Sequence, residues 1–234
     1  MEILQGQKTA MVLGASGLIG KFLIKHLLAN PAYKQVKVIA RAPLAQKHPK
    51  LKQIIIDFKK IPDFAKQIIG DDLYIAFGTT LAKAGSKEAF YQIDFNYVFD
   101  ISKFAVLNGV NQLLLVTAAG ADPEGRFFYN RVKGDLEVAV KKLPFWSTHI
   151  FQPSVLLGSR NENRIGENLA GFIGLGIDKI TGGLLSKYRP IEAELVAKSM
   201  IAAAQQFKPG IHVYPNSLLQ KMSKDWNRPL SQLN

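Results

Sequence analysis

Tyr129 and Lys133, four residues apart in the segment YNRVK, have the side-chain types needed to move a proton. The segment lies in an amphipathic stretch over residues 127–143 that predicts a helix, and residues four apart on a helix lie on one face. An ammonium close to a phenol favours the phenolate and lowers the phenol's pKa, so we expect Tyr129 to exchange a proton near neutral pH. Beside a nicotinamide, such a pair suits carbonyl reduction or alcohol oxidation.

The spacing alone is not specific, because the same YxxxK pattern recurs at Tyr33 and Lys37. That copy lies before and within a predicted strand over residues 35–40, where no helix brings the two side chains together. Position favours Tyr129, which lies in the helix after the fifth predicted strand. The alternative interpretation is a surface contact between a tyrosine and a lysine on an amphipathic helix.

A glycine-rich loop is the second chemically informative feature. In MVLGASGLIGKF, Gly14, Gly17 and Gly20 are spaced three apart, where an apolar strand over residues 9–14 passes into a helical pattern. Gly14 would permit a tight turn, Gly17 would let a pyrophosphate approach the backbone, and Gly20 would let the helix lie close to the sheet. The free N–H groups at the helix start would then face the phosphates. The alternative is a flexible turn that binds nothing.

The end of the second predicted strand favours NADP(H) over NAD(H). Its sequence, VIARAP, puts Arg41 where NAD sites usually place a carboxylate. A guanidinium suits a 2′-phosphate, although a surface arginine at a strand end is the alternative. We expect Asp57, after the third strand, to bond the adenine amino group. Phe77 and Gly78, which end the fourth strand, are expected to line the adenosine and ribose.

The elements that must position these residues alternate between strand-like and helix-like segments. This alternation predicts an α/β fold with a doubly wound parallel sheet, the Rossmann type. The expected strands are residues 9–14, 35–40, 52–57, 72–77, 111–117, 147–153 and 210–214. Besides the helix after the glycine loop, the expected helices are residues 64–69, 87–108, 127–143 and 191–207. We interpret residues 1–234 as one domain, with residues 158–190 as a small substrate lobe.

Composition narrows the class of protein further. The chain has no cysteine, which excludes disulfides and thiolate metal sites and favours a cytoplasmic location. Its apolar runs are too short to cross a bilayer, and its N-terminus lacks the features of a secretory signal. Four scattered histidines predict no metal site. The net charge of +12 leaves nucleic-acid binding as a weaker hypothesis, but no recognition motif for nucleic acid appears.

Taken together, these motifs resemble the short-chain dehydrogenase/reductase superfamily, and most closely its atypical Tat-interacting metastasis-suppressor oxidoreductase-like group. GASGLIG, FGTTLAKAG, GAD…FFYNRVKGDLE and QPSVLLGSRNENRIGE stand in that group's order over residues 8–215. The resemblance implies an NADPH-binding domain with Tyr129 and Lys133 as the catalytic pair and Arg41 at the 2′-phosphate. It further implies cofactor contacts by Ser16, Gly17, Leu18 and Ile19 at the pyrophosphate, Leu156 at the nicotinamide, and Arg164.

One departure from the superfamily concerns the substrate. Members usually carry a serine after the fifth strand, whereas LLLVTAAGAD offers only Thr117 as a hydroxyl, with Ala118 or Ala119 at the serine position. Thr117 is therefore the candidate substrate anchor. The small lobe argues against a bulky sugar nucleotide. The sequence thus predicts an NADP(H)-dependent oxidoreductase acting on an unknown small carbonyl or alcohol. The alternative is an NADPH-binding redox-sensing or regulatory protein with little catalytic activity, which acts through a protein partner.

Overall fold

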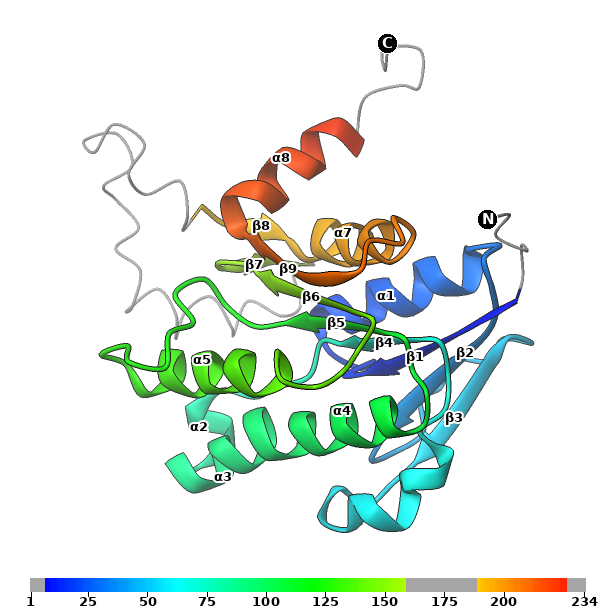
Figure 1. Cartoon of the computed structure of the whole chain (residues 1–234), viewed down its shortest axis with the longest axis horizontal. Coiled ribbons are helices and arrows are strands. Elements are labelled where there is room, and N and C mark those ends of the chain that lie inside the picture. Colours follow the sequence, from blue (N-terminus) through cyan, green and yellow to red (C-terminus); the bar gives the residue numbers. More distant parts are fainter. Residues whose placement is uncertain (1–6, 159–188, 227–234) are drawn as a thin grey trace.

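The computed structural model, which describes residues 7–158 and 189–226, contains a seven-stranded parallel sheet with the order β3-β2-β1-β4-β5-β6-β9 (Figure 1). Its strands are β1 Lys8–Leu13, β2 Tyr33–Ala40, β3 Leu51–Ile55, β4 Asp72–Ile75, β5 Gln112–Val116, β6 Ser147–Gln152 and β9 Gly210–Pro215. A separate two-stranded ladder pairs β7 Leu156–Leu157 with β8 Ile191–Glu192. The predicted doubly wound sheet is confirmed.

Helices cover both faces of this sheet. On one face lie α1 Leu18–Ala29 and α7 Ala193–Ala204, and on the other lie α4 Tyr97–Leu107 and α5 Phe128–Val140 (Figure 1). The remaining helical segments are η1 Phe58–Gln67, α2 Leu81–Ala84, α3 Lys87–Tyr91, η2 Gln92–Asn96 and α8 Asn216–Trp226. No helix within the described ranges combines the length and apolar character needed to span a bilayer.

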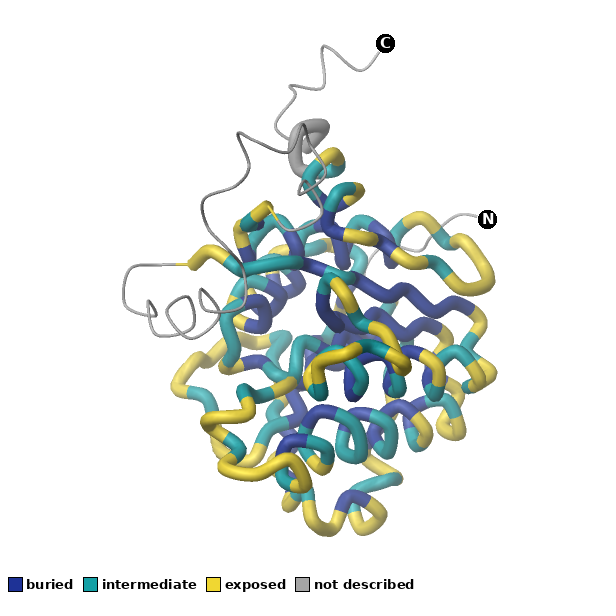
Figure 2. Tube along the Cα trace, turned by 90° about the vertical axis from the view of Figure 1, so that its left-hand side faces the viewer, coloured by how far each residue is buried: buried dark blue, intermediate teal, exposed yellow. Residues whose placement is uncertain are grey.

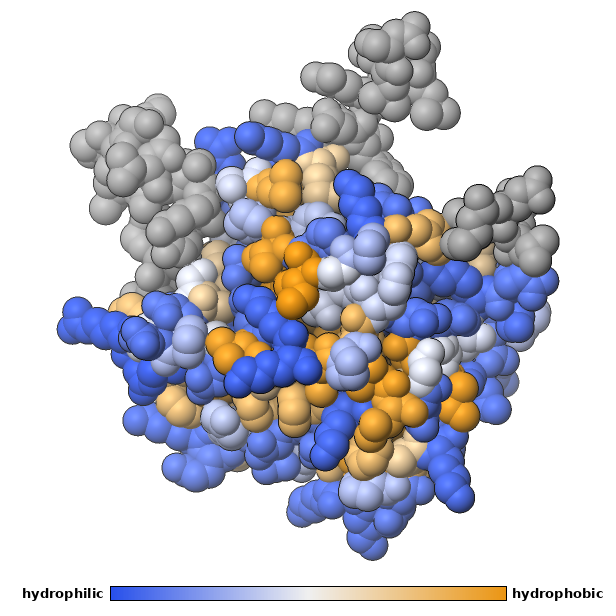
Figure 3. Space-filling model, in the orientation of Figure 1, coloured by the Kyte–Doolittle hydropathy of each residue, from blue (hydrophilic) through white to orange (hydrophobic). Residues whose placement is uncertain are grey.

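The two faces arise from the alternation of side chains along buried strands. In β1, Ala10 and Val12 belong to the apolar cluster beneath α1 and α7, whereas Met11 and Leu13 belong to the cluster beneath η1, α4 and α5. Buried residues accordingly fill the space between sheet and helices, with exposed residues at the rim (Figure 2). On the surface, apolar side chains gather in small groups inside a largely hydrophilic outline (Figure 3).

Two predicted helices differ from the structure in kind. The helix expected at residues 64–69 is the last part of the 3₁₀ segment η1, which begins earlier because the Asp57 carboxylate accepts the Lys59 backbone N–H at 2.9 Å and caps it. The helix expected at residues 87–108 is interrupted by η2, a π-helical turn between α3 and α4. A π turn inserts an extra residue into the helix and shifts which side chains face the sheet.

The order in which successive strands are added to the sheet reverses at β1, which pairs with β2 on one side and with β4 on the other. In open α/β sheets, ligands bind in the crevice at the carboxyl ends of the strands where this reversal occurs. The loop after β5 extends from this edge, which lies at the left of Figure 1 and faces the viewer in Figure 2.

The predicted substrate lobe, residues 158–190, falls almost entirely outside the described residues. The chain on either side of it is well anchored to the sheet. Ile191 donates its backbone N–H to the Val155 carbonyl at 2.9 Å, and the Asn216 amide donates to the Arg189 carbonyl at 2.8 Å. The residues on either side of the segment are therefore held at the β7–β8 ladder and at the start of α8.

Close packing of α1 on the sheet leads to a stability prediction. A Cβ at Gly20 would lie 2.0 Å from the Gly14 carbonyl oxygen, which is backbone and cannot move aside. Helix propensity alone predicts that Gly20→Ala stabilises the protein by about 0.5–1 kcal/mol. We expect the contact to prevail, so that Gly20→Ala lowers the free energy of unfolding by about 1–3 kcal/mol in urea titration.

The matched control is Lys25→Ala on the exposed side of the same helix, where we expect a change within about 0.5 kcal/mol. A Gly20→Ala protein as stable as the wild type would show that α1 does not pack this closely.

Candidate functional site

The glycine loop sits at the reversal of the sheet, with no room for side chains on its inner side. Gly14 has a φ of +92°, and a Cβ there would lie 2.3 Å from the carbonyl oxygen of Ala76, just after β4. Gly17 donates its N–H to the Gly14 carbonyl at 3.0 Å, which closes the turn. Only glycine at Gly14 combines this left-handed backbone with the approach to the β4 end.

The start of α1 offers main-chain donors to an anion. Gly17 is the N-cap and has no side chain to satisfy them, and the first intrahelical bond joins the Lys21 N–H to the Gly17 carbonyl at 3.0 Å. The N–H groups of Leu18, Ile19 and Gly20 precede that bond, and the first turn contains no acidic residue. This cradle fits a pyrophosphate by its shape and by its partial positive charge.

Ser16 and Ile19 are also predicted to contact the pyrophosphate, but they differ in which of their atoms could reach it. Ser16 is exposed in the loop between the glycines, so its hydroxyl is accessible. The Ile19 side chain is buried in the apolar cluster beneath α1, so Ile19 could contact a phosphate only through its backbone N–H.

The predicted adenosine contacts follow the carboxyl ends of neighbouring strands. Arg41 comes directly after β2, which runs beside β1 with Ile39 opposite Leu13, and its side chain is exposed. Asp57 follows β3, and one of its oxygens already accepts the N–H that caps η1. Phe77 follows β4 and stacks on Phe58, with ring centres 5.2 Å apart. The parallel order of the sheet thus brings these residues to the same edge as the glycine loop.

Tyr129 and Lys133 lie on one face of α5, as the sequence predicts. The Lys133 Nζ lies 5.9 Å from the centre of the Tyr129 ring. The Lys133 side chain is buried, whereas Tyr129 is 39% exposed overall and its ring lies against that of Phe90 at 5.8 Å. The pair therefore has an open side from which a ligand can approach and a buried side that fixes the ammonium.

Asp94, on the π turn η2, is the functional candidate that sequence reasoning missed. Its Oδ1 lies 2.7 Å from the Lys133 Nζ in a buried ion pair, and its Oδ2 accepts the Thr79 backbone N–H at 2.8 Å. The sequence does contain a signal: Phe90, Asp94 and Val98 recur every four residues and all are buried. A carboxylate on the apolar stripe of a helix needs a partner.

Gly78 lies over this ion pair. A Cβ at Gly78 would come within 2.7 Å of the Asp94 Oδ1 and 3.3 Å of the Lys133 Nζ. Gly78 itself is exposed. The absence of a side chain at Gly78 therefore leaves the space that the buried Asp94–Lys133 pair occupies beneath it.

The electrostatics correct one prediction. Burial raises the pKa of Tyr129; the Lys133 ammonium opposes this rise, and the Asp94 carboxylate adds to it. Burial lowers the pKa of Lys133, but Asp94, with contributions from Tyr129 and Glu137, outweighs burial and raises it overall. Lys133 therefore does act to lower the pKa of Tyr129, as the sequence predicts, but the expected proton exchange near neutral pH is wrong, because burial and Asp94 together exceed the effect of the lysine and raise the pKa overall.

Thr117 is buried and already bonded. Its hydroxyl donates to the Glu137 carboxylate at 2.6 Å, and the Gln152 amide donates to the same carboxylate at 3.0 and 3.1 Å. Glu137 lies one helical turn beyond Lys133 on α5. The hydroxyl proton of Thr117 is thus directed at Glu137, and its role as a substrate anchor stays a prediction.

The loop between β5 and α5 is fixed beside Tyr129. A Cβ at Gly134 would lie 2.2 Å from the Pro123 backbone nitrogen, so α5 and the loop are in backbone contact. The Arg131 guanidinium donates to the carbonyls of Gly125 and Arg126 at 3.1 and 2.9 Å. These contacts fix the loop against α5, the helix that carries Tyr129.

The predicted nicotinamide contacts lie where β7 meets the glycine loop. Leu156 is partly buried in β7, and a Cβ at Gly158 would lie 2.3 Å from a methyl group of Leu18 at the start of α1. Gly158, two residues after Leu156, therefore lies against the start of α1. Arg164 lies outside the described residues.

The second YxxxK copy belongs to a different part of the molecule. The Tyr33 hydroxyl donates to the buried Asp72 carboxylate at 2.5 Å, whereas the Lys37 ammonium donates to the Ile69 carbonyl at 2.7 Å. The two side chains therefore have separate partners and do not act as a pair.

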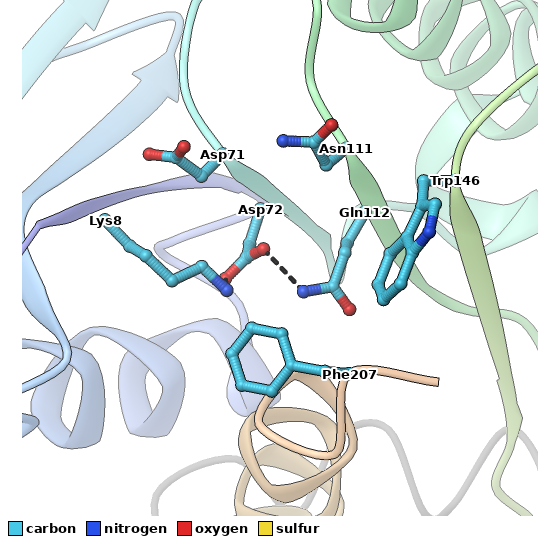
Figure 4. A pocket seen from close by; sticks show the side chains of 7 residues that line it. All are labelled: Lys8, Asp71, Asp72, Asn111, Gln112, Trp146 and Phe207. Atoms are coloured by element: carbon cyan, nitrogen blue, oxygen red, sulfur yellow. Dashed lines mark hydrogen bonds and ion pairs between the residues drawn. The ribbon is translucent and has the colours of Figure 1, made fainter. Parts of the chain in front are cut away.

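Asp72 also lines an open cavity of about 280 Å³ at the amino ends of β1, β4 and β5. In Figure 4 its carboxylate lies between Lys8 and Gln112, whose amide donates to it at 2.9 Å, while Trp146 and Phe207 flank the opening. Because this is the edge opposite the glycine loop, the cavity does not include the motif residues.

Comparison with known proteins places the chain in a family. Residues 14–142 match the family model described as NAD(P)H-binding. Protein HTATIP2 of Rattus norvegicus is 35% identical over 167 residues, which cover 70% of this chain and 69% of that protein. Protein FMP52, mitochondrial, of Candida albicans is 36% identical over 206 residues, which cover 85% of this chain and 88% of that protein.

These relatives correct the predicted cytoplasmic location. The FMP52 proteins of Candida albicans, Emericella nidulans and Aspergillus niger are named as mitochondrial, and each matches more than four-fifths of this chain. The prediction was wrong because it rested on the absence of cysteine. That absence excludes disulfides but does not distinguish the cytoplasm from any other compartment in which disulfides are not needed.

Solved structures agree with the fold. MoeE5 in complex with UDP-glucuronic acid and NAD superposes with a TM-score of 0.68 at 14% identity, covering 88% of this chain and 75% of that one. A short chain dehydrogenase family protein from Francisella tularensis superposes with a TM-score of 0.62 at 15% identity, covering 92% of this chain and 100% of that one. The chain therefore belongs to the NAD(P)H-binding family and, within it, is related to the HTATIP2 and FMP52 proteins.

Proposed function

We propose that the chain is an NADP(H)-dependent oxidoreductase that acts on a small carbonyl compound or the corresponding alcohol. One observation carries the proposal: the segment after β4 touches both halves of the site. Its Ala76 carbonyl lies against Gly14 in the glycine loop, and Gly78, two residues later, lies over the Lys133 ammonium. A dinucleotide that starts at the loop and follows this segment would end beside Tyr129 and Lys133.

In this proposal the residues divide into binding and proton-handling groups. NADPH, when bound, supplies a hydride to the carbonyl carbon. The N–H groups at the start of α1 bind the pyrophosphate, and the Arg41 guanidinium binds the 2′-phosphate. Lys133 donates hydrogen bonds to the nicotinamide ribose, while Tyr129 gives its hydroxyl proton to the carbonyl oxygen.

The remaining predicted contacts complete the cofactor site. The free oxygen of Asp57 accepts from the adenine amino group, and Phe77 and Gly78 line the adenosine and ribose. Leu156 lies beside the nicotinamide, and Arg164 adds a further contact.

A second candidate, a redox-sensing NADPH-binding protein with little turnover, is favoured by the environment of Thr117. The hydroxyl of Thr117 is engaged with Glu137, and Ala118 and Ala119 carry no hydroxyl, so the loop after β5 offers no free side-chain hydroxyl from these three residues to hold a substrate oxygen. This candidate predicts that NADPH changes the affinity for a protein partner without being consumed. Screening the purified protein with NADPH against aldehydes and ketones separates the two candidates.

Arg41 provides the test of cofactor choice. Arg41→Ala removes the guanidinium that faces the 2′-phosphate, so we expect the dissociation constant for NADPH to rise about 10- to 100-fold, equivalent to the loss of about 1.5–3 kcal/mol for hydrogen bonds to a charged group. The dissociation constant for NADH should change little, since NADH lacks that phosphate. Isothermal titration calorimetry with both cofactors measures the difference.

Lys47→Ala, an exposed lysine in the same loop, is the control for a general loss of positive charge. Equal weakening of NADPH and NADH binding by Arg41→Ala, or equal effects of the two variants on NADPH, would contradict the assigned role.

Tyr129 provides the test of chemistry. Tyr129→Phe removes the proton donor but keeps the ring, so we expect kcat for carbonyl reduction to fall about 100-fold or more while NADPH binding is retained. The control is Tyr91→Phe, since the Tyr91 ring stacks on that of Phe95, with ring centres 4.7 Å apart. Turnover by Tyr129→Phe at the wild-type rate would exclude Tyr129 as the proton donor.

A further inference from the structure

We propose that Asp94 is a positioning residue for the Tyr129–Lys133 pair: its carboxylate holds the Lys133 ammonium in place and balances its charge, so that Tyr129 serves as a proton donor. The consequence for the reaction rests on the proposed function. The ionisation of Tyr129 itself is a property of the protein without cofactor or substrate, and it can be measured separately.

The Asp94 carboxylate is held at both oxygens. Oδ1 pairs with the Lys133 Nζ at 2.7 Å, and Oδ2 accepts the Thr79 N–H at 2.8 Å. The Asp94 side chain is 1% exposed and the Lys133 side chain 6% exposed, so the two charges attract one another with little screening by water. Asp94 reaches this position from a π turn, a distortion of helices that is frequent at functional sites.

The charges that act on the pair come from α5 itself and from the π turn η2. Lys133 and Asp94 act on the Tyr129 hydroxyl, and Asp94 and Glu137 act on Lys133. The other charged groups of this region face elsewhere. Lys141 lies 3.7 Å from Glu137, Lys87 lies over the Phe128 ring, and Lys103 on α4 acts on Asp100.

The positive charge of Lys133 is therefore balanced in large part by neighbouring carboxylates, which reduces its effect on the Tyr129 phenol. The carboxylate in direct contact belongs to Asp94, and that of Glu137 lies one helical turn away. The Lys133 ammonium favours the phenolate of Tyr129, but burial and the Asp94 carboxylate together outweigh it and raise the pKa of Tyr129, so Tyr129 stays protonated through neutral pH.

A protonated Tyr129 fits one direction of the reaction. In reduction, the carbonyl carbon accepts the hydride that NADPH supplies, and the carbonyl oxygen takes the Tyr129 proton to become a hydroxyl. The phenolate left behind recovers a proton from water, so the balance is one carbonyl, one NADPH and one proton giving one alcohol and one NADP⁺. Alcohol oxidation needs the phenolate at the outset, and this form is scarce until the pH is alkaline.

Replacement of Asp94 by Asn tests the ionisation directly. Asp94→Asn removes a negative charge that disfavours the Tyr129 phenolate. It also leaves the Lys133 charge less balanced, so that the ammonium favours the phenolate more strongly. Lys133 stays protonated because Glu137 still favours its charged form. We expect the pKa of Tyr129 to fall by about one pH unit or more. The measurement is a pH titration by NMR of cofactor-free protein labelled with ¹³Cζ-tyrosine, in which the Tyr129→Phe spectrum identifies the Tyr129 signal.

Asp100→Asn, the same substitution on the neighbouring helix, is the matched control and should leave the Tyr129 titration unchanged. An Asp94→Asn protein that titrates like the wild type would overturn the proposal and leave Asp94 a structural role only. If Asp94→Asn does not fold, Gly78→Ala provides the test. Its Cβ would lie only 2.7 Å from the Asp94 Oδ1, so the carboxylate must move, and the Tyr129 titration should shift in the same direction.

The pH profile of turnover gives a second readout that a purely structural role would not move. For the wild type we expect kcat/KM for reduction to be flat from pH 6 to 9, and in Asp94→Asn to decline at a pH about one unit lower than in the wild type. Alcohol oxidation by the variant at neutral pH should rise about tenfold for each unit by which the pKa falls. A shifted NMR titration without any turnover would retain the proposal for Asp94 and reject the oxidoreductase assignment.

Discussion

Backbone contact between the glycine loop, the start of α1 and the end of β4 is the constraint on which the rest of the site depends. The positions that a Cβ would take at Gly14 and Gly20 are occupied by main-chain atoms of Ala76 and of Gly14 itself. This packing aims the first N–H groups of α1 at the crevice where the sheet reverses. It also fixes the course of the next residues after β4, which pass over the buried Lys133.

Buried charged groups at the C-terminal ends of the strands also hold the site together. Lys133 lies between the carboxylate of Asp94 on one side and that of Glu137 one turn away, and Glu137 in turn is held by Thr117 and Gln152. Charges this far from water stay ionised only when they are paired. The network therefore ties α5 to the π turn, to the end of β5 and to β6, beside Tyr129.

The sequence predicted the parts of this arrangement that follow from periodicity and turn chemistry. Alternating apolar segments were sufficient for the doubly wound sheet, and glycine spacing was sufficient to locate the turn at its reversal. Helical spacing marks Asp94 as a buried residue, but it was missed because that spacing does not show its partner, Lys133, which lies on another helix. The pKa of Tyr129 was misjudged for a related reason: YxxxK spacing gives the nearest charge but neither the burial nor the second charge. The roles of Arg41, Asp57 and Leu156 follow from strand order and stay predictions.

The central claim is that a dinucleotide rests on the amides at the start of α1 and reaches Lys133 past Gly78. A crystal structure of the protein with NADP⁺ tests it most directly. The account predicts the pyrophosphate at the N–H groups of Leu18 and Ile19, the 2′-phosphate at Arg41, and the nicotinamide ribose within hydrogen-bond distance of the Lys133 Nζ. NADP⁺ bound at any other place on the protein, or no binding at saturating cofactor, would contradict it.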